Sequence, residues 1–332
     1  MLTQKEKKVS RSIVLILAGL FLVLWMSHET LAQGKEVFPS KTVTIVVPWA
    51  AGGSSDTAAR VMAKHLSEIW GQPVIVVNQP GATGVIGSLK LAASEPDGYT
   101  VGLLSTAVQT TQYTSPNPTD RHAYTYVIGA YFEPFTMAVK GDAPWKSLKE
   151  FVEYAKANPG KITHSSSGAA STDKLVAMAF ARRSGIQLPD VPFEGYAPAV
   201  TAVLSGKIHS TSATLANLAP YLKSGDLRVL AVSSEKRLSE YPNVPTFMEN
   251  GVNLKWINWN GILGPKGIPA ERMAAIQTAV EKVYAMKAWQ DFMTTSFIYS
   301  FPLKGDQFKT QIDKDDPVLK EMIEGAGLMR AK

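Results

Sequence analysis

The chain has 332 residues and no cysteine. This absence excludes a disulfide framework, a thiol nucleophile and a cysteine-ligated metal site. The histidines show no spacing typical of metal ligands, so we expect no metal site. Basic residues are scattered among acidic ones, which argues against a nucleic-acid partner. The length is enough for two domains with a sizeable hydrophobic core.

Only one long apolar run is present, and it lies near the N-terminus. Residues 13–26 form this run, after four basic residues and before the small residues Thr30 and Ala32. This order is typical of a secretory signal peptide. A membrane anchor is the alternative, but 14 residues are few against the ~20 that a spanning helix needs. We therefore predict a signal peptide over residues 1–32, cleaved after about Ala32, and a protein of the bacterial periplasm that needs no cofactor.

The rest of the chain alternates between predicted strands and helices. Residues 41–48 and 73–78 are β-branched apolar runs, and a helical pattern from Asp56 to Trp70 separates them. A similar cycle begins after residue 139, and one long helix is predicted from Ala270 to about Phe292. These patterns predict an α/β fold with two domains, each a doubly wound, mainly parallel sheet.

Two bends rich in glycine and serine stand between a predicted strand and a predicted helix. The first is "PWAAGGSSD" (48–56) and the second is "SSSGAASTDK" (165–174). In each, free N–H groups at the start of the helix lie beyond the end of a strand, where open α/β sheets bind ligands. We expect Ser54 or Ser55 to cap the first helix. An ordinary glycine–serine turn is the alternative for each bend, whereas the Lys-Ser/Thr pair of a phosphate-binding loop is absent.

Ser171 and Lys174 fit the S-x-x-K motif of serine β-lactamases. The companion S-D-N and K-T-G motifs are missing. An exported serine hydrolase therefore stays an alternative function.

Seven segments, in order from about Phe38 to the C-terminal helix, together resemble the periplasmic receptors of tripartite tricarboxylate transporters, the TctC-like or Bug proteins. They are "PWAAGGSSD", "GQPVIVVNQPGATGVIG", "PDGYTV", "VPFEGYAPAVTAVLSGKIH", "YLKSGDLRVLAVSSEKR", "PNVPTF" and "GPKGIPAE". The resemblance implies a two-domain, Venus-flytrap fold of the periplasmic binding type, with a cleft between the domains. We expect residues 33–135 and 256–332 to form one domain and residues 136–255 the other.

The resemblance also implies a function. The protein would be a monomeric receptor, not an enzyme, that captures a small carboxylate and delivers it to a transporter with two integral membrane subunits. The ligand would be a di- or tricarboxylate or an aromatic acid. A sensory binding protein that feeds a membrane kinase is a further alternative.

Residues 51–56 and 166–172 match the loops that hold the ligand carboxylate in this family, largely through backbone groups. We expect Asp56 to fix the first loop, because a carboxylate in contact with the ligand would repel it. The predicted ligand-binding residues are Trp49, Ala51, Gly52, Gly53, Ser54, Ser55, Asp56, Thr83, Phe132, Glu133, Ser166, Ser167, Gly168, Ala169, Ala170, Ser171, Thr172, Tyr196, Ala213 and Thr214.

Several of these positions depart from the usual family pattern, and they favour different ligands. Ala213 replaces a common acidic residue and Lys174 a common histidine, which would suit a more anionic ligand. Tyr196 together with Phe132 would stack on a ring. Glu133 would favour an amino group.

Overall fold

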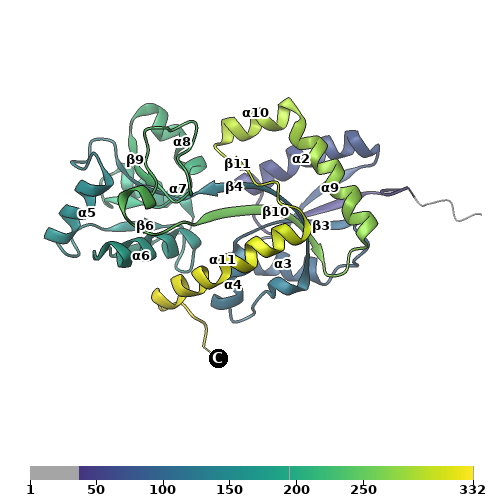
Figure 1. Ribbon diagram of the computed structural model, residues 1–332, viewed down its shortest axis with the longest axis horizontal. Coiled ribbons are helices and arrows are strands. Elements are labelled where there is room, and N and C mark those ends of the chain that lie inside the picture. Colours follow the sequence, from purple (N-terminus) through teal and green to yellow (C-terminus); the bar gives the residue numbers. More distant parts are fainter. Residues whose placement is uncertain (1–36, 194, 332) are drawn as a thin grey trace, which may run out of the picture. The chain divides into compact units, whose positions relative to one another are not determined.

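The structure, a computed structural model, describes residues 37–193 and 195–331. The predicted signal peptide lies outside these residues. The chain from Lys41 onward clusters as one unit, which holds two sheets with helices packed around them (Figure 1).

The first sheet has six strands in the order β11-β4-β10-β3-β1-β2. Strands β2 and β3 each pair with β1 in parallel, whereas β10 is antiparallel to β3, and β4 is antiparallel to both β10 and β11. Their bounds are β1 Val43–Val47, β2 Val74–Asn78, β3 Thr100–Ser105, β4 Tyr124–Pro134, β10 Ile257–Pro265 and β11 Tyr299–Ser300.

The second sheet has five strands in the order β7-β6-β8-β5-β9. Strand β6 pairs in parallel with β7 and β8, and β5 is antiparallel to β8 and β9. The bounds are β5 Thr136–Lys140, β6 His164–Ser166, β7 Asp190–Pro192, β8 Ser210–Thr211 and β9 Leu227–Val232.

The predicted α/β class with two sheets is confirmed, but the sheets are mixed rather than mainly parallel. The reason is the path of the chain between them. Strand β4 ends at Pro134 in the first sheet and β5 begins at Thr136 in the second, and the chain returns along β10. Because β4 and β10 carry the chain in opposite directions, they pair as antiparallel neighbours.

Helices connect most of the strands, and two differ from their predicted bounds. Helix α2 begins at Ser54 with Gly53 as its N-cap and no side-chain cap, so the expected serine cap is wrong. The predicted long helix is two helices, α9 and α10, because Met286 between them is extended (ψ 134°). The helices are α2 Ser54–Trp70, α3 Val85–Ala92, α4 Ala107–Thr114, α5 Leu148–Ala157, α6 Thr172–Ser184, α7 Tyr196–Leu204, α8 Leu215–Ser224, α9 Ala270–Ala285, α10 Lys287–Ser296 and α11 Gly305–Gly325, with 3-10 turns η1 Ala82–Gly84, η2 Arg121–Ala123 and η3 Met248–Asn250.

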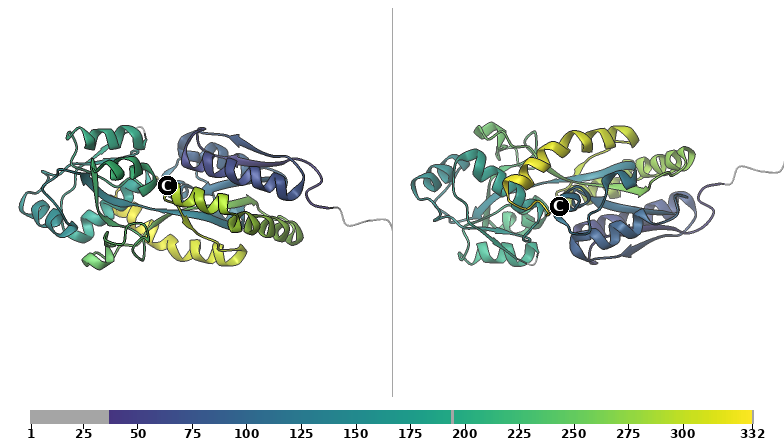
Figure 2. Two further views of the ribbon diagram at one scale, coloured as in Figure 1. Left: turned by 90° about the horizontal axis from the view of Figure 1, so that it is seen from above. Right: turned by 90° about the horizontal axis from the view of Figure 1, so that it is seen from below.

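Helix α11 contributes to the cores beside both sheets (Figures 1 and 2). Phe308 and Ile312 pack beside the first sheet, whereas Leu319 and Met322 pack in the core that includes residues of β5 and α6. Pro317 lies between these two halves of the helix. The helix therefore joins the two cores at a second place, apart from the strands.

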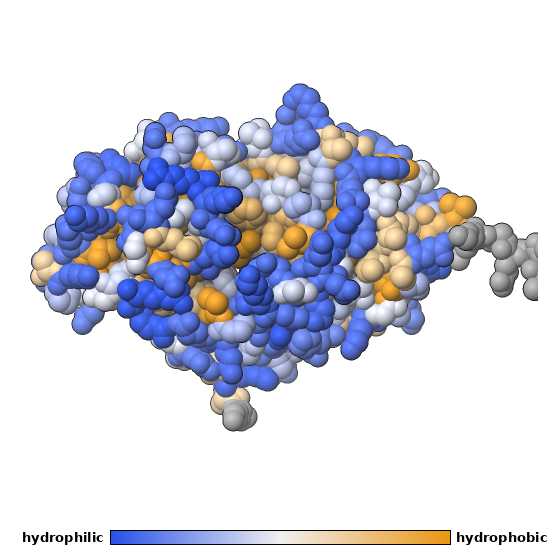
Figure 3. All heavy atoms as spheres, in the orientation of Figure 1, coloured by the Kyte–Doolittle hydropathy of each residue, from blue (hydrophilic) through white to orange (hydrophobic). Residues whose placement is uncertain are grey.

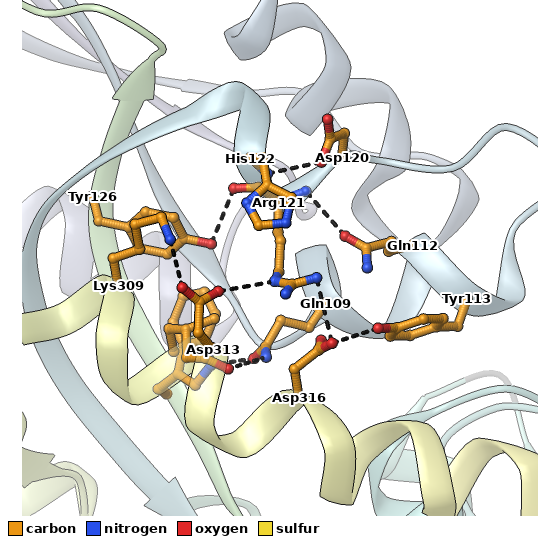
Figure 4. A network of polar contacts seen from close by, with 12 residues as sticks. Gln109, Gln112, Tyr113, Asp120, Arg121, His122, Tyr126, Lys309, Asp313 and Asp316 are labelled. Carbon is orange, nitrogen blue, oxygen red and sulfur yellow. Dashed lines mark hydrogen bonds and ion pairs between the residues drawn. The ribbon is translucent and has the colours of Figure 1, made fainter. Parts of the chain in front are cut away.

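A polar network fixes the middle of α11 (Figure 4). Arg121 lies between Asp313 and Asp316, with nitrogen–oxygen distances of 3.3 and 3.4 Å. The Tyr113 hydroxyl, from α4, donates to Asp316 as well. This arrangement ties α4 and η2 to the last helix.

Hydrophilic residues cover most of the face drawn in Figure 3, with small groups of apolar residues between them. Among the described residues, no helix combines the length and apolar character needed to cross a membrane.

Candidate functional site

The strands that join the two sheets carry a polar face. In the β4–β10 pair, Glu133 lies opposite Asn258 and Tyr131 opposite Asn260, while Phe132 and Trp259 between them point to the other face. Asn258 Nδ2 donates to Glu133 Oε2 at 2.9 Å. The sequence "INWNG" (257–261) thus places two amides beside a carboxyl and a phenol. We call this set of four residues, Tyr131, Glu133, Asn258 and Asn260, the junction face.

The first bend (residues 48–56) follows β1 and runs into the first turn of α2. Asp56 is buried and reaches back to hold it: Oδ2 accepts from the Gly52 N–H at 2.9 Å, and Oδ1 accepts from Asn78 Nδ2 at 2.9 Å. Arg60 also donates to Asp56, and chiefly for that reason the pKa of this carboxyl falls to about 2. Gly52 has a φ of +88°, which glycine adopts without strain. Asp56 therefore fixes the loop from within its own helix.

The N–H groups of Gly53, Ser54 and Ser55 donate to no acceptor in the described part of the chain. They lie at the positive end of the α2 dipole. The Ser55 hydroxyl donates to Asn260 Oδ1 at 3.3 Å, which brings the bend next to the junction face.

The second bend (residues 165–174) begins at the end of β6 and runs into the first turn of α6. Here Asp173 repeats the role of Asp56: Oδ2 accepts from the Ser167 N–H at 2.8 Å and Oδ1 from the Ser167 hydroxyl at 2.7 Å. Gly168 accepts from the Ser171 hydroxyl at 2.8 Å. The bends thus share one construction, in which an aspartate in the first turn of the helix holds the preceding loop.

The N–H groups of Ala169, Ala170 and Thr172 likewise bond to no described acceptor. The Thr172 hydroxyl lies 3.5 Å from that of Thr110 on α4. This contact joins the start of α6, beside the second sheet, to a helix beside the first. Both bends therefore present unbonded donors where the two sheets meet.

Glu133 lies between the bends and is only 2% exposed. Burial raises its pKa to about 7, although the amides of Asn258 and Asn260 and the hydroxyls of Ser54 and Thr214 oppose this shift. Its Oε1 has no hydrogen-bond partner among the described residues, and the same holds for Asn260 Nδ2 and the Tyr131 hydroxyl.

Tyr196, at the start of α7, connects Glu133 to the second bend. Burial raises the pKa of its hydroxyl well above the ordinary value, the charges of Asp173 and Glu133 raise it further, and the nearby Ser167 opposes this. Thr214 is the N-cap residue of α8, is buried, and accepts from Asn217 Nδ2 at 2.7 Å. Residues of four elements thus surround one carboxyl group.

Four more predicted residues can be placed in the structure. The Trp49 ring packs on Gly84, next to the exposed Thr83, whose φ is +55°. Ala213 is fully buried, and its carbonyl accepts from Thr136. Phe132 packs against Tyr299 with ring centroids 5.4 Å apart, on the face of β4 opposite Glu133. The expected stacking partnership of Phe132 with Tyr196 is therefore not supported by the strand geometry.

Lys174 does not supply a free positive charge. Its Nζ lies 3.3 Å from Asp190 Oδ2, and both side chains are mostly buried. Asp190 also accepts from the Ser166 hydroxyl at 3.0 Å. Since Ser171 donates to a backbone carbonyl and Lys174 is paired with Asp190, the S-x-x-K match does not form a nucleophile–base pair.

Sequence reasoning missed Asn258, Asn260 and Thr106. The Thr106 hydroxyl donates to Asn258 Oδ1 at 2.6 Å and orients that amide toward Glu133. A signal was available: Asn258 and Asn260 recur with period two in an otherwise apolar strand, which is unusual for a buried face.

Comparison with known proteins shows the family of the chain. The profile of the "Tripartite tricarboxylate transporter family receptor" family (TctC) matches residues 58–328. A UPF0065 protein from the gbd 5' region of Cupriavidus necator is 32% identical over 296 residues, covering 89% of this chain and 90% of that protein.

Two solved structures are similar in fold and sequence. A TctC solute-binding protein from Polaromonas is 29% identical, with a TM-score of 0.75 over 86% of this chain and 99% of that one. An R. palustris protein solved with adipate is 26% identical, with a TM-score of 0.78 over 87% of this chain and 98% of that one. The chain belongs to the TctC family of tripartite tricarboxylate transporter receptors and has the fold of its solute-binding proteins.

Proposed function

We propose that the protein is a periplasmic receptor that binds a small organic carboxylate between its two bends and passes it to a tripartite membrane transporter. The observation that supports this most is the shared construction of the bends. Asp56 and Asp173 each use their carboxylate to hold a loop, so the N–H groups at the starts of α2 and α6 stay available. A carboxylate is the simplest ligand for such donors.

The donors would bind the ligand without a cationic side chain. Hydrogen bonds to a charged group contribute ~1.5–3 kcal/mol each, and the helix dipole adds ~0.3–1 kcal/mol. Three or four such bonds would together contribute roughly 5–12 kcal/mol before the cost of association. The adipate held by the R. palustris relative supports the same ligand class.

We propose no catalysed reaction at this site. Ser171 and Lys174, the one candidate catalytic pair in the sequence, are bonded to other groups. We therefore assign the junction of the two sheets to binding and release, with every predicted ligand-binding residue except Phe132 and Ala213 as a candidate contact or support.

A thermal-shift and calorimetric screen tests the proposal. The purified protein is titrated with di- and tricarboxylates, amino acids and aromatic acids. A ligand at about 100 times its Kd stabilises the fold by ~2.7 kcal/mol, a shift of a few degrees for a chain of this size. Absence of any shift, in protein shown to be folded and free of retained ligand, would contradict the assignment. Uptake of the labelled ligand by cells with and without the gene then tests transport.

A further inference from the structure

Among the acidic side chains near the bends in the described part of the chain, Glu133 lacks a cationic partner and also keeps one carboxyl oxygen unbonded, whereas Asp173, which has no cation either, accepts from Ser167 at both oxygens. Asp56 pairs with Arg60 at 3.0 Å and Asp190 with Lys174 at 3.3 Å. No ion pair within the described ranges includes Glu133, and its Oε1 is unbonded. A buried carboxylate of this kind is costly until a donor or a cation reaches it.

The unbonded oxygen, Glu133 Oε1, lies in a buried and ordered polar site and not on the surface. The Asn258 amide holds Oε2, and Thr106 in turn holds that amide, so the carboxyl group is fixed in orientation. Ser54, on the first bend, acts on the same carboxyl, and its N–H is among the donors assigned to the ligand. A ligand whose carboxylate contacts the first bend therefore has its next atoms close to Glu133.

We propose that Glu133 is a specificity-determining residue, which selects carboxylates that also carry a protonated nitrogen over carboxylates of the same skeleton without one. An α-amino acid is the simplest member of this class. The ammonium group would donate to Glu133 Oε1 and supply the positive charge that the chain itself does not place there. This inference rests on the proposed function, since it assumes that the ligand's carboxylate binds at the bends.

The charge state of Glu133 distinguishes ammonium-bearing carboxylates from their main competitors, ligands with a second carboxylate. A second carboxylate beside Glu133 would be repelled unless Glu133 took up a proton, whereas an ammonium group requires the ionised form. The titratable groups that act with Glu133 are Tyr131 on β4 and Tyr196 on α7, and Asp173 on α6 acts on Tyr196. Both tyrosines have raised pKa values and stay neutral near pH 7, so Glu133 itself controls the charge.

The two classes consequently give opposite pH dependence. With the pKa of Glu133 at about 7, the ionised fraction rises between pH 6 and pH 8. Affinity for an ammonium-bearing carboxylate then increases over this range. Affinity for a dicarboxylate that needs the protonated form decreases.

Matched pairs of ligands test the proposal by calorimetry at pH 6 and pH 8. The pairs are succinate and aspartate, adipate and 2-aminoadipate, and 3-phenylpropanoate and phenylalanine. In any pair of which a member binds, we expect the amino acid to bind at least about tenfold more tightly than its amino-free partner at pH 8. This difference in affinity should be smaller at pH 6. An amino-free member that binds equally well or better in the unmodified protein would overturn the inference while leaving the proposed function standing.

The variant Glu133→Gln keeps the shape of the side chain and removes its charge. We expect it to lose about 10- to 100-fold in affinity for the amino member and little for the other. Glu153→Gln, the same change at an exposed position of α5, is the matched control and should bind like the unmodified protein. Unchanged selectivity in Glu133→Gln would also overturn the inference. Absence of binding by every acid tested would overturn the proposed function and this inference with it.

Discussion

Gly53 offers the sharpest test of the first bend, because its φ suits proline and a proline there would remove its N–H. Gly53 has φ −78° and ψ 172°, near the φ of about −65° that proline requires. A Cβ at this position would meet only the Ala50 carbonyl oxygen, at an ordinary 3.8 Å. The N–H that would be lost bonds to no described acceptor. The fold should therefore tolerate Gly53→Pro, with a melting temperature close to that of the unmodified protein.

The expected loss is that of one hydrogen bond to a charged ligand. Such a bond contributes ~1.5–3 kcal/mol, so Gly53→Pro should weaken binding by about 10- to 100-fold. Gly53→Ala is the matched control: it adds a methyl group at the same place and keeps the N–H. Its affinity should stay within about threefold of the unmodified protein, a difference below ~0.7 kcal/mol.

Calorimetric titration with the tightest carboxylate from the screen measures all three proteins, and thermal denaturation monitors their folding. Normal affinity in a folded Gly53→Pro protein would refute the assignment of this N–H as a ligand donor. Equal losses in the proline and alanine variants would show that space in the bend, and not the donor, controls binding.

The remaining predictions concern side chains near the bends. Ser171→Ala should leave ester and lactam turnover unchanged, at the background rate; a rate that the substitution abolishes would restore the hydrolase alternative. Lys174→Met should lower the free energy of unfolding by roughly 1–3 kcal/mol in urea denaturation, because it leaves Asp190 buried without its partner; unchanged stability would show that the pair contributes nothing. Burial raises the pKa of Glu133, so its contribution to the free energy of unfolding is fully present below about pH 4.5 and is lost, by about 3 kcal/mol, as the pH rises through about 7. Unfolding curves of Glu133→Gln measured over this pH range should lack the loss. If the variant and the unmodified protein gave the same pH profile of stability, the prediction would be refuted. The pKa of Asp56 is lowered, so this residue should stabilise the fold above about pH 4, and the stabilisation should be lost as the pH falls through about 2. Asp56→Asn should therefore be about 2 kcal/mol less stable than the unmodified protein at pH 7. Equal stability of the two proteins at pH 7 would contradict this.

Local patterns predicted the elements of the fold but not the way in which strands pair. The strand from Val43 to Val47 and the helix that ends at Trp70 follow from periodicity and from the glycine after the helix. The antiparallel pairing of β4 with β10 depends on residues more than a hundred positions apart, which no local pattern records. The break between α9 and α10 occurs at Met286, without a proline or glycine to mark it.

The candidate site could likewise be predicted only in part from the sequence. Both bends could be located from the sequence, since glycine, serine and a helix start are local features. Asn258 and Asn260 join the site only because β10 pairs with β4. Neighbouring residues of a strand point to opposite faces, so the sequence alone could have indicated that Phe132 and Glu133 lie on opposite faces of their strand.

The pairing of charges around the bends explains why binding here would depend on backbone geometry. Arg60 and Lys174 lie near the two bends, and each is engaged by an aspartate of the chain itself, Asp56 and Asp190 respectively. A bound carboxylate would then meet neutral donors whose positions Asp56 and Asp173 fix. Affinity would thus be controlled by two aspartates that need not touch the ligand. Glu133, which has no cation and keeps Oε1 unbonded among the described residues, is left to distinguish one carboxylate from another.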